Sequence, residues 1–320
     1  MKHVFVVDSG SFFDQSWKID SIYKDIEEYF DTQKNPDYSI VISKYRRDAI
    51  VLIQEQLDKI KDEDSARIYA IGGDEILFDC LNSIAELPNV EFAIMPVEDG
   101  KCDFLRSFGE GNAEYFKDIK SLIKAPVIST DIIDIERLYA INACIIGFAS
   151  AVPFKIKELN KKLGRNGDEN DFFFFNKIVN FFGSLFTALD KKIITQNYRI
   201  TIDDEDYSGN YCLINIANGP YYDNGRITVE GAIPDDGFLD IALFKSASFF
   251  QNIQFTRNYA HGETPLNCVR MQAKKITIQS DERMWIQLDG EYFQDKKITL
   301  KVIPGALQLA AVNNLTYQIF

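Results

Sequence analysis

Two glycines and an aspartate follow a short apolar run, and this tripeptide could contact a phosphate group. The run "ARIYAI" (residues 66–71) has the length of a buried strand, and Gly72-Gly73-Asp74 connects it to an amphipathic, helix-like segment. Glycines at the end of a parallel strand let a phosphate approach the backbone, and the N–H groups of the next helix can then bind it. The same tripeptide also fits a plain strand-to-helix turn in which Asp74 caps the helix. The chain contains neither a P-loop motif nor a Rossmann fingerprint, so both interpretations stay open at this point.

Acidic residues recur at three further turns, where they could hold a metal ion or accept a proton. Asp103 follows a polar turn that contains Gly100, Asp236 belongs to an Asp-Asp-Gly turn, and Asp289 and Glu291 flank a glycine. Carboxylate oxygens are ligands that Mg²⁺ prefers, and a carboxylate within hydrogen-bond reach of an alcohol can take its proton. Asp-Gly is also a strong signal for a type I′ hairpin turn. From the local sequence alone, a simple turn is the favoured interpretation for Asp289.

The elements that must position these residues follow two different patterns along the chain. Up to about residue 124, short apolar runs alternate with longer amphipathic segments, which is typical of an α/β domain on a parallel sheet. The predicted strands are 3–7, 38–43, 66–73 and 90–97, and the predicted helices between them are 19–30, 47–61 and 75–87.

The remainder of the chain predicts a second, mostly antiparallel domain. Apart from a helical stretch at about 150–190, it is rich in short β-type runs separated by Asp, Gly and Asn turns, a density typical of a β-sandwich. The predicted strands include 198–203, 211–218, 239–244, 275–280, 285–293 and 297–303. We therefore expect an α/β domain over residues 1–125 and a β-sandwich domain over 126–303, with the tail 304–320 packing back on the first domain.

The composition limits the classes of protein to which the chain can belong. Its 320 residues are 46% hydrophobic and 26% charged, as in globular proteins, and the net charge of -13 argues against a nucleic-acid binder. Five scattered cysteines without paired spacing favour reduced thiols over a disulfide framework or a structural zinc site. No run reaches the roughly 18 apolar residues that span a bilayer, and the N-terminal apolar run is too short for a signal peptide. We expect a cytoplasmic protein.

Taken in order, these motifs resemble those of the diacylglycerol kinase catalytic-domain family, which includes bacterial lipid kinases and sphingosine kinases. The family motif Gly-Gly-Asp-Gly-Thr is similar to residues 72–76, and its Pro-x-Gly-Thr/Ser-x-Asn-Asp-Phe motif is similar to residues 96–104. An Ile-Asn motif is similar to "INACIIGFAS", residues 141–150. The segments "NGPYYDNGRITVEGAIPDDGFLD", "LDGEYF" and "ITLKVIPGALQL" follow the family closely. The resemblance covers essentially the whole chain.

The resemblance implies a two-domain kinase, related to NAD kinases and phosphofructokinases, that binds ATP between an α/β domain and a β-sandwich. It implies that Asp289 is the general base for a lipid hydroxyl, with Glu291 of the same Asp-Gly-Glu motif in the catalytic site. Asp74 and Asp103 would bind Mg²⁺ and organise the phosphates, and Asp236 would belong to a structural Mg²⁺ site. The residues that the resemblance places at the nucleotide are Gly72, Gly73, Asp74, Glu75, Gly100 and Asp103.

The chain departs from the family pattern on the nucleotide side. Glu75 and Ile76 replace the third glycine and the threonine, and the turn around Gly100 has gained a residue and lost its hydroxyl and its Asn. A Glu carboxylate is favourable at a helix N-terminus, but it repels a phosphate in the same place unless a cation bridges the two. Two hypotheses follow: an ATP- and Mg²⁺-dependent lipid kinase, or a catalytically degenerate relative that binds lipid or nucleotide. An NAD kinase is disfavoured because the C-terminal half follows the lipid-kinase pattern.

The expected partner is a lipid, and two segments raise the question of contact with the inner membrane surface. Basic residues gather in residues 154–166, and phenylalanines gather in residues 172–186. Contact with anionic lipid or with an acyl chain is one interpretation. A solvated helix face for the first segment and a core helix for the second are the commoner explanations.

Overall fold

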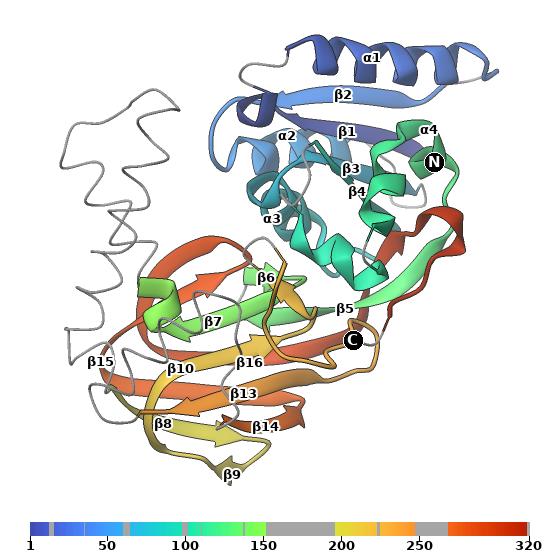
Figure 1. Ribbon diagram of the computed structural model, residues 1–320. Coiled ribbons are helices and arrows are strands. Elements are labelled where there is room, and N and C mark those ends of the chain that lie inside the picture. The colour runs from blue at the N-terminus through green and yellow to red at the C-terminus, as the bar shows by residue number, and fades with distance from the viewer. Residues whose placement is uncertain are drawn as a thin grey trace, which may run out of the picture.

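Figure 1 shows two halves of the molecule, an upper one with helices around a sheet and a lower one made almost wholly of strands. The computed structural model describes residues 1–12, 16–34, 36–59, 65–97, 102–109, 111–136, 138–151, 196–222, 225–246 and 268–318. Within these ranges a 14-stranded sheet runs through both halves, and a two-stranded sheet lies apart from it. The two halves are therefore joined by continuous backbone hydrogen bonding.

Four parallel strands form the sheet of the first half. They are β1 (Lys2–Asp8), β2 (Tyr38–Ser43), β3 (Ala66–Gly72) and β4 (Val90–Pro96). Their order across the sheet is β4-β3-β1-β2, with parallel pairing throughout. β3 is buried along its full length, because the helices of an α/β unit cover both faces of a parallel sheet.

The helices of this half lie on two faces because the chain reverses its direction across the sheet. The α-helices are α1 (Ser16–Asp31), α2 (Asp48–Leu57), α3 (Asp74–Ile84) and α4 (Ile119–Lys124). The chain moves from β1 to β2 on one side and then back past β1 to β3 and β4, so right-handed crossovers put α1 on one face and α2 and α3 on the other. In agreement, α2 packs against α3 and α1 packs against α4. The loops after β1 and β3 diverge at the reversal and open a crevice, which is where α/β proteins bind ligands.

Within the described residues, four short 3-10 helices add to these, and residues 148–151 are also helical. The 3-10 helices are η1 (Ser9–Phe12), η2 (Asp103–Phe108), η3 (Asn112–Lys117) and η4 (Val312–Asn314). η2 brings Asp103 to the end of the segment that follows β4.

The second half consists of antiparallel strands. They are β5 (Val127–Ile135), β6 (Leu138–Ala140), β7 (Ala143–Gly147), β8 (Gln196–Ile202), β9 (Glu205–Asp206), β10 (Gly209–Ala217), β11 (Tyr221–Tyr222), β12 (Arg226–Ile227), β13 (Leu239–Lys245), β14 (Cys268–Ala273), β15 (Lys275–Leu288) and β16 (Glu291–Ala310). Every pairing between two strands of this half is antiparallel. β8 alternates buried and exposed residues along its length, the pattern of a strand with one face on a core.

β16 carries the sheet from the second half into the first (Figure 1). It pairs with β15 and β5 in the second half and then runs parallel to β4, with Leu309 opposite Phe92. The register shifts between Ile303 and Leu307, and Gly305 there has a φ of 62°. This bulge bends β16 between the antiparallel part of the sheet and its parallel part.

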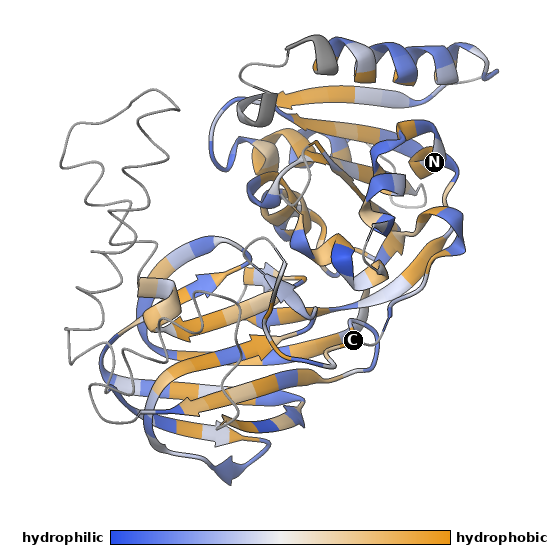
Figure 2. Ribbon diagram, in the orientation of Figure 1, coloured by the Kyte–Doolittle hydropathy of each residue, from blue (hydrophilic) through white to orange (hydrophobic). Residues whose placement is uncertain are grey.

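Each half has a large apolar core, and Figure 2 shows hydrophobic residues concentrated on the strands of both halves. Phe78 of α3 is fully buried in the core of the second half. In the opposite direction, Leu309 and Val312 near the C-terminus are buried in the core of the first half. The rings of Phe104 and Phe108 contact Tyr317, so the last residues of the chain pack on the α/β half.

Several sequence predictions concern residues outside the described ranges. These are Gly100, the basic segment 154–166, the Phe-rich segment 172–186 and most of the helical stretch expected at 150–190. Among the helices that are described, none combines the length and the apolar character needed to span a bilayer.

Candidate functional site

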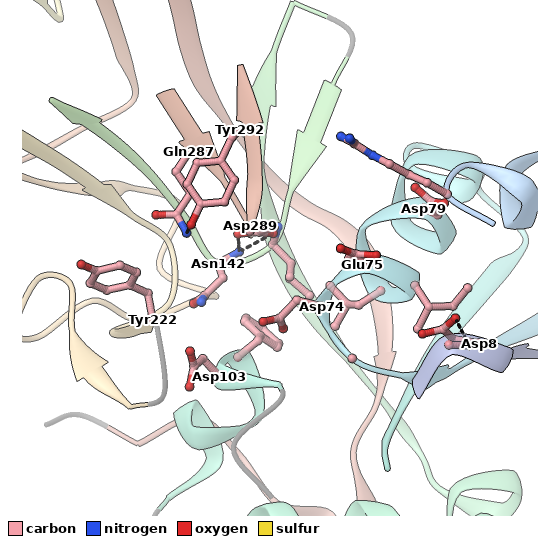
Figure 3. Close-up of a pocket in the computed structure, with 18 of the residues that line it drawn as sticks. Asp8, Asp74, Glu75, Asp79, Asp103, Asn142, Tyr222, Gln287, Asp289 and Tyr292 are labelled. Atoms are coloured by element: carbon pink, nitrogen blue, oxygen red, sulfur yellow. Dashed lines mark hydrogen bonds between the residues drawn. The ribbon is translucent and has the colours of Figure 1, made fainter. Parts of the chain in front are cut away.

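A cavity of about 660 Å³ lies where the two halves meet, and Figure 3 shows its lining side chains. One wall is formed by residues at the carboxyl ends of β1, β2 and β3, including Asp8, Ser43 and Gly73. The other wall comes from the turn between β6 and β7 and from the hairpin between β15 and β16, including Asn142 and Asp289. The volume falls within the range of about 300–1,000 Å³ that is usual for small-molecule sites.

Asp74 enters the cavity from the start of α3. Gly73 is the N-cap residue and no side chain caps the helix, so the alternative in which Asp74 is the cap is wrong. Burial, and then the negative charges of Asp103 and Asp289, raise the pKa of the Asp74 carboxyl well above its usual value. This carboxylate therefore gains from any cation that enters the cavity.

Glu75 follows at the next position and lines the same cavity. Its side chain is exposed, and Figure 3 shows its carboxylate between those of Asp289 and Asp8. Two acids thus occupy the first turn of α3, where the helix dipole and the uncapped N–H groups attract negative charge.

Asp103 lines the cavity from the start of η2 and is only 4% exposed. Its Oδ1 accepts the backbone N–H of Gly225 at 2.9 Å and the Nε–H of Arg106 at 3.3 Å. These contacts hold the carboxylate in place beside Asp74.

Asp289 belongs to a two-residue hairpin turn and faces the cavity at the same time. Asp289 and Gly290 have φ values of 43° and 85°, and Leu288 pairs with Glu291 on either side of them, as in a type I′ turn. The carboxylate accepts the backbone N–H of Ile141 at 2.7 Å, of Ala143 at 2.8 Å and of Asn142 at 3.2 Å. Burial raises the pKa of Asp289 to about 6, although these three N–H groups act in the opposite direction. The turn and the site are therefore the same structure.

The structure separates other predicted site residues from the cavity. Glu291 is 7% exposed and is not among the lining residues, because its carboxylate is paired with Arg46 and Arg47. Asp236, which was predicted for a separate structural Mg²⁺ site, also lies outside the cavity, and its carboxylate accepts the backbone N–H of Phe238 at 2.9 Å and a side-chain N–H of Gln272 at 3.0 Å. Gly73 lines the cavity, whereas Gly72 is the last residue of β3 and pairs with Pro96.

Sequence reasoning missed several residues that line this cavity, and four of them are amide or basic residues. Asn142 and Gln287 are buried, and one amide oxygen of each has no hydrogen-bond partner. Lys44 and Arg46 bring positive charge from the loop between β2 and α2. The run "SKYRRD" directly after a strand of an acidic chain is the signal that could have revealed the basic pair, whereas nothing local distinguishes the two amides.

The donors around the cavity fit Mg²⁺ bound together with phosphate. Among the described residues no group of three His, Cys, Asp or Glu side chains is placed to hold a metal by itself. Mg²⁺ commonly uses one or two carboxylates and completes its coordination with water and substrate phosphates. Asp74 and Asp103 supply such carboxylates, and each described cysteine is a free thiol.

Sequence comparison finds relatives among bacterial proteins. Residues 168–311 match the family described as the YegS C-terminal NAD kinase beta sandwich-like domain. A protein of Staphylococcus aureus (strain JH9) that carries the name "putative lipid kinase" is 27% identical over 282 residues, which are 87% of each chain. The protein of that name in strain Newman is 28% identical over 285 residues, again 87% of each chain.

Solved structures share the whole fold. A "putative diacylglycerol kinase" from Bacillus anthracis str. Sterne has a TM-score of 0.69 at 22% sequence identity and covers 98% of both chains. An NAD kinase from Archaeoglobus fulgidus, solved in complex with ATP, has a TM-score of 0.51 at 10% identity and covers 97% of this chain and 94% of its own. This likeness establishes a two-domain fold whose C-terminal domain is a β-sandwich.

Proposed function

This chain is a relative of the diacylglycerol kinase family, and on that premise we propose that it transfers a phosphoryl group from ATP to a hydroxyl of a diacylglycerol-like or sphingoid lipid. The observation that carries this proposal is the meeting of Asp74, Asp103 and Asp289 at one cavity between the halves. These three acids come from distant parts of the sequence and need not converge in a protein that uses only one of the halves.

Asp289 is the proposed general base. As the oxygen of the acceptor hydroxyl forms its bond to phosphorus, the bond between phosphorus and the leaving phosphate oxygen breaks, and the hydroxyl proton passes to the carboxylate. A pKa of about 6 leaves this carboxylate mostly ionised at neutral pH and still basic enough to take a proton. The N–H groups of Ile141, Asn142 and Ala143 fix its direction.

Asp74 and Asp103 are the proposed ligands of Mg²⁺, which when bound neutralises charge on the transferring phosphoryl group. The raised pKa of Asp74 is consistent with a site that is completed by a cation. Gly73 at the start of α3 keeps side chains away from the helix N–H groups, so phosphate oxygens can approach them. Glu291 acts in this proposal through its ion pairs and not as a proton acceptor.

The alternative is a catalytically degenerate relative that binds lipid or nucleotide, and two observations favour it. Glu75 puts a carboxylate at the position where the helix would bind phosphate. Both oxygens of Asp289 already accept backbone N–H groups, which leaves fewer lone pairs for a proton. The two proposals differ in whether a phosphoryl group passes from ATP to a lipid.

Calorimetry with ATP and Mg²⁺ on the native chain and on Glu75→Gly distinguishes the proposals. Binding by the native chain together with transfer of labelled phosphate from ATP to a lipid acceptor supports the kinase, whereas binding without transfer supports the degenerate relative. Binding that appears only after Glu75→Gly means that residue 75 closes the phosphate site, and the kinase proposal fails. Diacylglycerol and sphingosine in mixed micelles are suitable acceptors, and Asp289→Asn is the catalytic control.

We also propose domain boundaries near residues 125 and 303 and transient contact with a membrane surface. β5 begins at Val127 and the bulge in β16 follows Ile303, which are the points where the chain passes between the halves. A lipid acceptor must be taken from a bilayer, so sedimentation with vesicles that contain the acceptor is the direct test of the membrane contact.

A further inference from the structure

Four charged residues form a cluster beside the mouth of the cavity and connect the two halves. Glu291 at the start of β16 pairs with Arg46, and its Oε2 lies 3.4 Å from a guanidinium nitrogen of Arg47. Arg47 also pairs with Asp79 of α3 at 2.6 Å. We call these residues, Arg46, Arg47, Asp79 and Glu291, the arginine cluster.

The two arginines of this cluster are held very differently. Arg47 is fixed, because its backbone N–H also donates to Asp79 at 2.8 Å and its guanidinium lies 4.7 Å from the centre of the Phe78 ring. The side chain of Arg46 is 60% exposed, and Glu291 is the carboxylate that the described residues place against it. Arg46 also lines the cavity, whereas Arg47 does not. Arg46 is thus the arginine that can turn toward a ligand.

The negative charge of the cavity wall favours such a residue for binding a phosphate ligand. The lining side chains that are acidic are Asp8, Asp74, Glu75, Asp79, Asp103 and Asp289. Within the described residues, Lys44 and Arg46 are the basic side chains that line the same cavity. A polyphosphate is repelled by so many carboxylates, and a guanidinium can offset this repulsion because its fork of N–H donors matches two phosphate oxygens.

We propose that Arg46 is a phosphate-binding residue of the nucleotide site and that Glu291 holds its guanidinium in the free protein until phosphate displaces it. The inference rests on the proposed use of ATP and adds to it a residue and a competition that control entry. When Arg46 turns away, Glu291 still has Arg47 within 3.4 Å, so its buried carboxylate is not left without a cation. This second partner lowers the free-energy cost of moving Arg46, because an unpaired buried charge would be strongly destabilising.

The test is calorimetry with Mg²⁺-ATP and, separately, with Mg²⁺-tripolyphosphate, which lacks the nucleoside. Arg46→Ala should weaken both affinities by about tenfold or more, the worth of a charged hydrogen-bonded contact. Glu291→Gln should strengthen both by about threefold, because the competing charge is gone. In Arg46→Ala, the added substitution Glu291→Gln should change both affinities little, because no Arg46 guanidinium is left to release.

Arg199→Ala is the matched control. Arg199 pairs with the exposed Asp281 at 2.8 Å and does not line the cavity, so its loss should leave both affinities unchanged. Thermal unfolding of every variant checks that the fold is retained.

The outcomes separate this inference from the proposed function. Unchanged ATP affinity in Arg46→Ala, or no gain in Glu291→Gln, overturns the inference and leaves the kinase proposal standing. Arg46-dependent binding of tripolyphosphate without binding of ATP overturns the nucleotide part of the inference and counts against the kinase. If neither ligand binds to the native chain or to Glu291→Gln, both are rejected.

Discussion

At the scale of single residues, carboxylates dominate the wall of the cavity, and their surroundings differ. Asp103 is held by Arg106 and Gly225, and Asp289 is held by three backbone N–H groups. Asp74 and Asp289 both have raised pKa values, with burial as the main cause. Protonation of Asp289 near pH 6 therefore belongs to the chemistry of the site.

The rate of phosphoryl transfer should fall as the pH drops through about 6. Asp289 must be ionised to accept a proton, and its pKa is raised to about 6. We expect a rate that is nearly constant above pH 7 and declines about tenfold for each unit well below 6. A pH profile of kcat/KM measures this, and a flat profile between pH 5 and 7 argues against Asp289 as the base.

The same carboxyl should affect stability in the opposite direction. Its folded-state pKa lies above the unfolded value of about 3.9, so the folded protein binds the proton more tightly between about pH 4 and 6. The stability that this group contributes is present below pH 4 and is lost as the pH rises through 6. Urea midpoints of the native chain and of Asp289→Asn across this range test the sign.

Asp289→Asn should also lower the free energy of unfolding, by about 2–4 kcal/mol. The amide group would bring N–H donors against the N–H groups of Ile141, Asn142 and Ala143, where the carboxylate accepts. Chemical denaturation measures the loss. A variant as stable as the native chain would mean that these backbone contacts contribute little, and loss of activity could then be assigned to the base alone.

At the scale of elements, β7 supports the site because the turn before it supplies the N–H groups that bind Asp289. β7 lies between β10 and β15 and ends at Gly147, whose φ is 112°. A Cβ atom at Gly147 would lie 2.4 Å from the backbone oxygen of Cys212. Since that oxygen belongs to the neighbouring strand, it cannot move away without disturbing the sheet.

Gly147→Ala should therefore cost about 3 kcal/mol or more of stability, through the strained φ and the clash with backbone. Gly231→Ala is the matched control, because Gly231 has a φ of 88° but no atom within 4 Å of the added Cβ. Its cost should be about 1 kcal/mol, from φ alone. Equal losses in the two variants would show that the close approach of β7 and β10 is not the cause.

At the scale of the whole molecule, the cavity exists because two halves are held in one arrangement. β16 crosses between them. At the bulge in β16, Asp131 accepts the N–H group of Gly305 at 2.7 Å, and it also accepts that of Gly237 at 2.7 Å. On the other side, Asn82 of α3 donates to the carbonyl of Tyr139 at 2.9 Å and accepts its N–H at 2.8 Å. Asn82 thus ties a helix of the first half to β6 of the second.

Asn82→Ala should destabilise the protein by about 2 kcal/mol and weaken the coupling between the halves. The substitution leaves the N–H and C=O groups of Tyr139 without their side-chain partner at a partly buried interface. We expect one cooperative unfolding transition for the native chain and a broader or split transition for the variant, measured by denaturant titration with two spectroscopic probes. A single transition of unchanged slope in the variant would show that the contacts of Asn82 are not needed to couple the halves.

Local features of the sequence were sufficient to predict much of the fold. The alternation of apolar and amphipathic segments predicted the α/β part, and the Asp-Gly pair at 289–290 predicted the type I′ turn that the φ values show. These features depend on neighbouring residues, so the sequence alone contains them. The resemblance to lipid kinases in turn directed attention to Asp74, Asp103 and Asp289, and all three line one cavity.

Tertiary structure alone decided which charges meet at the cavity and which are withdrawn from it. Arg46 and Glu291 are 245 positions apart, and Asn142 and Gln287 belong to different turns and strands, so no local pattern relates either pair. Glu291 was predicted beside Asp289 in the catalytic site, yet the two have different partners, because Asp289 lies in the turn itself and Glu291 is the first residue of β16. The packing of the two halves determines which charged residues face this site, and local sequence propensity does not encode that packing.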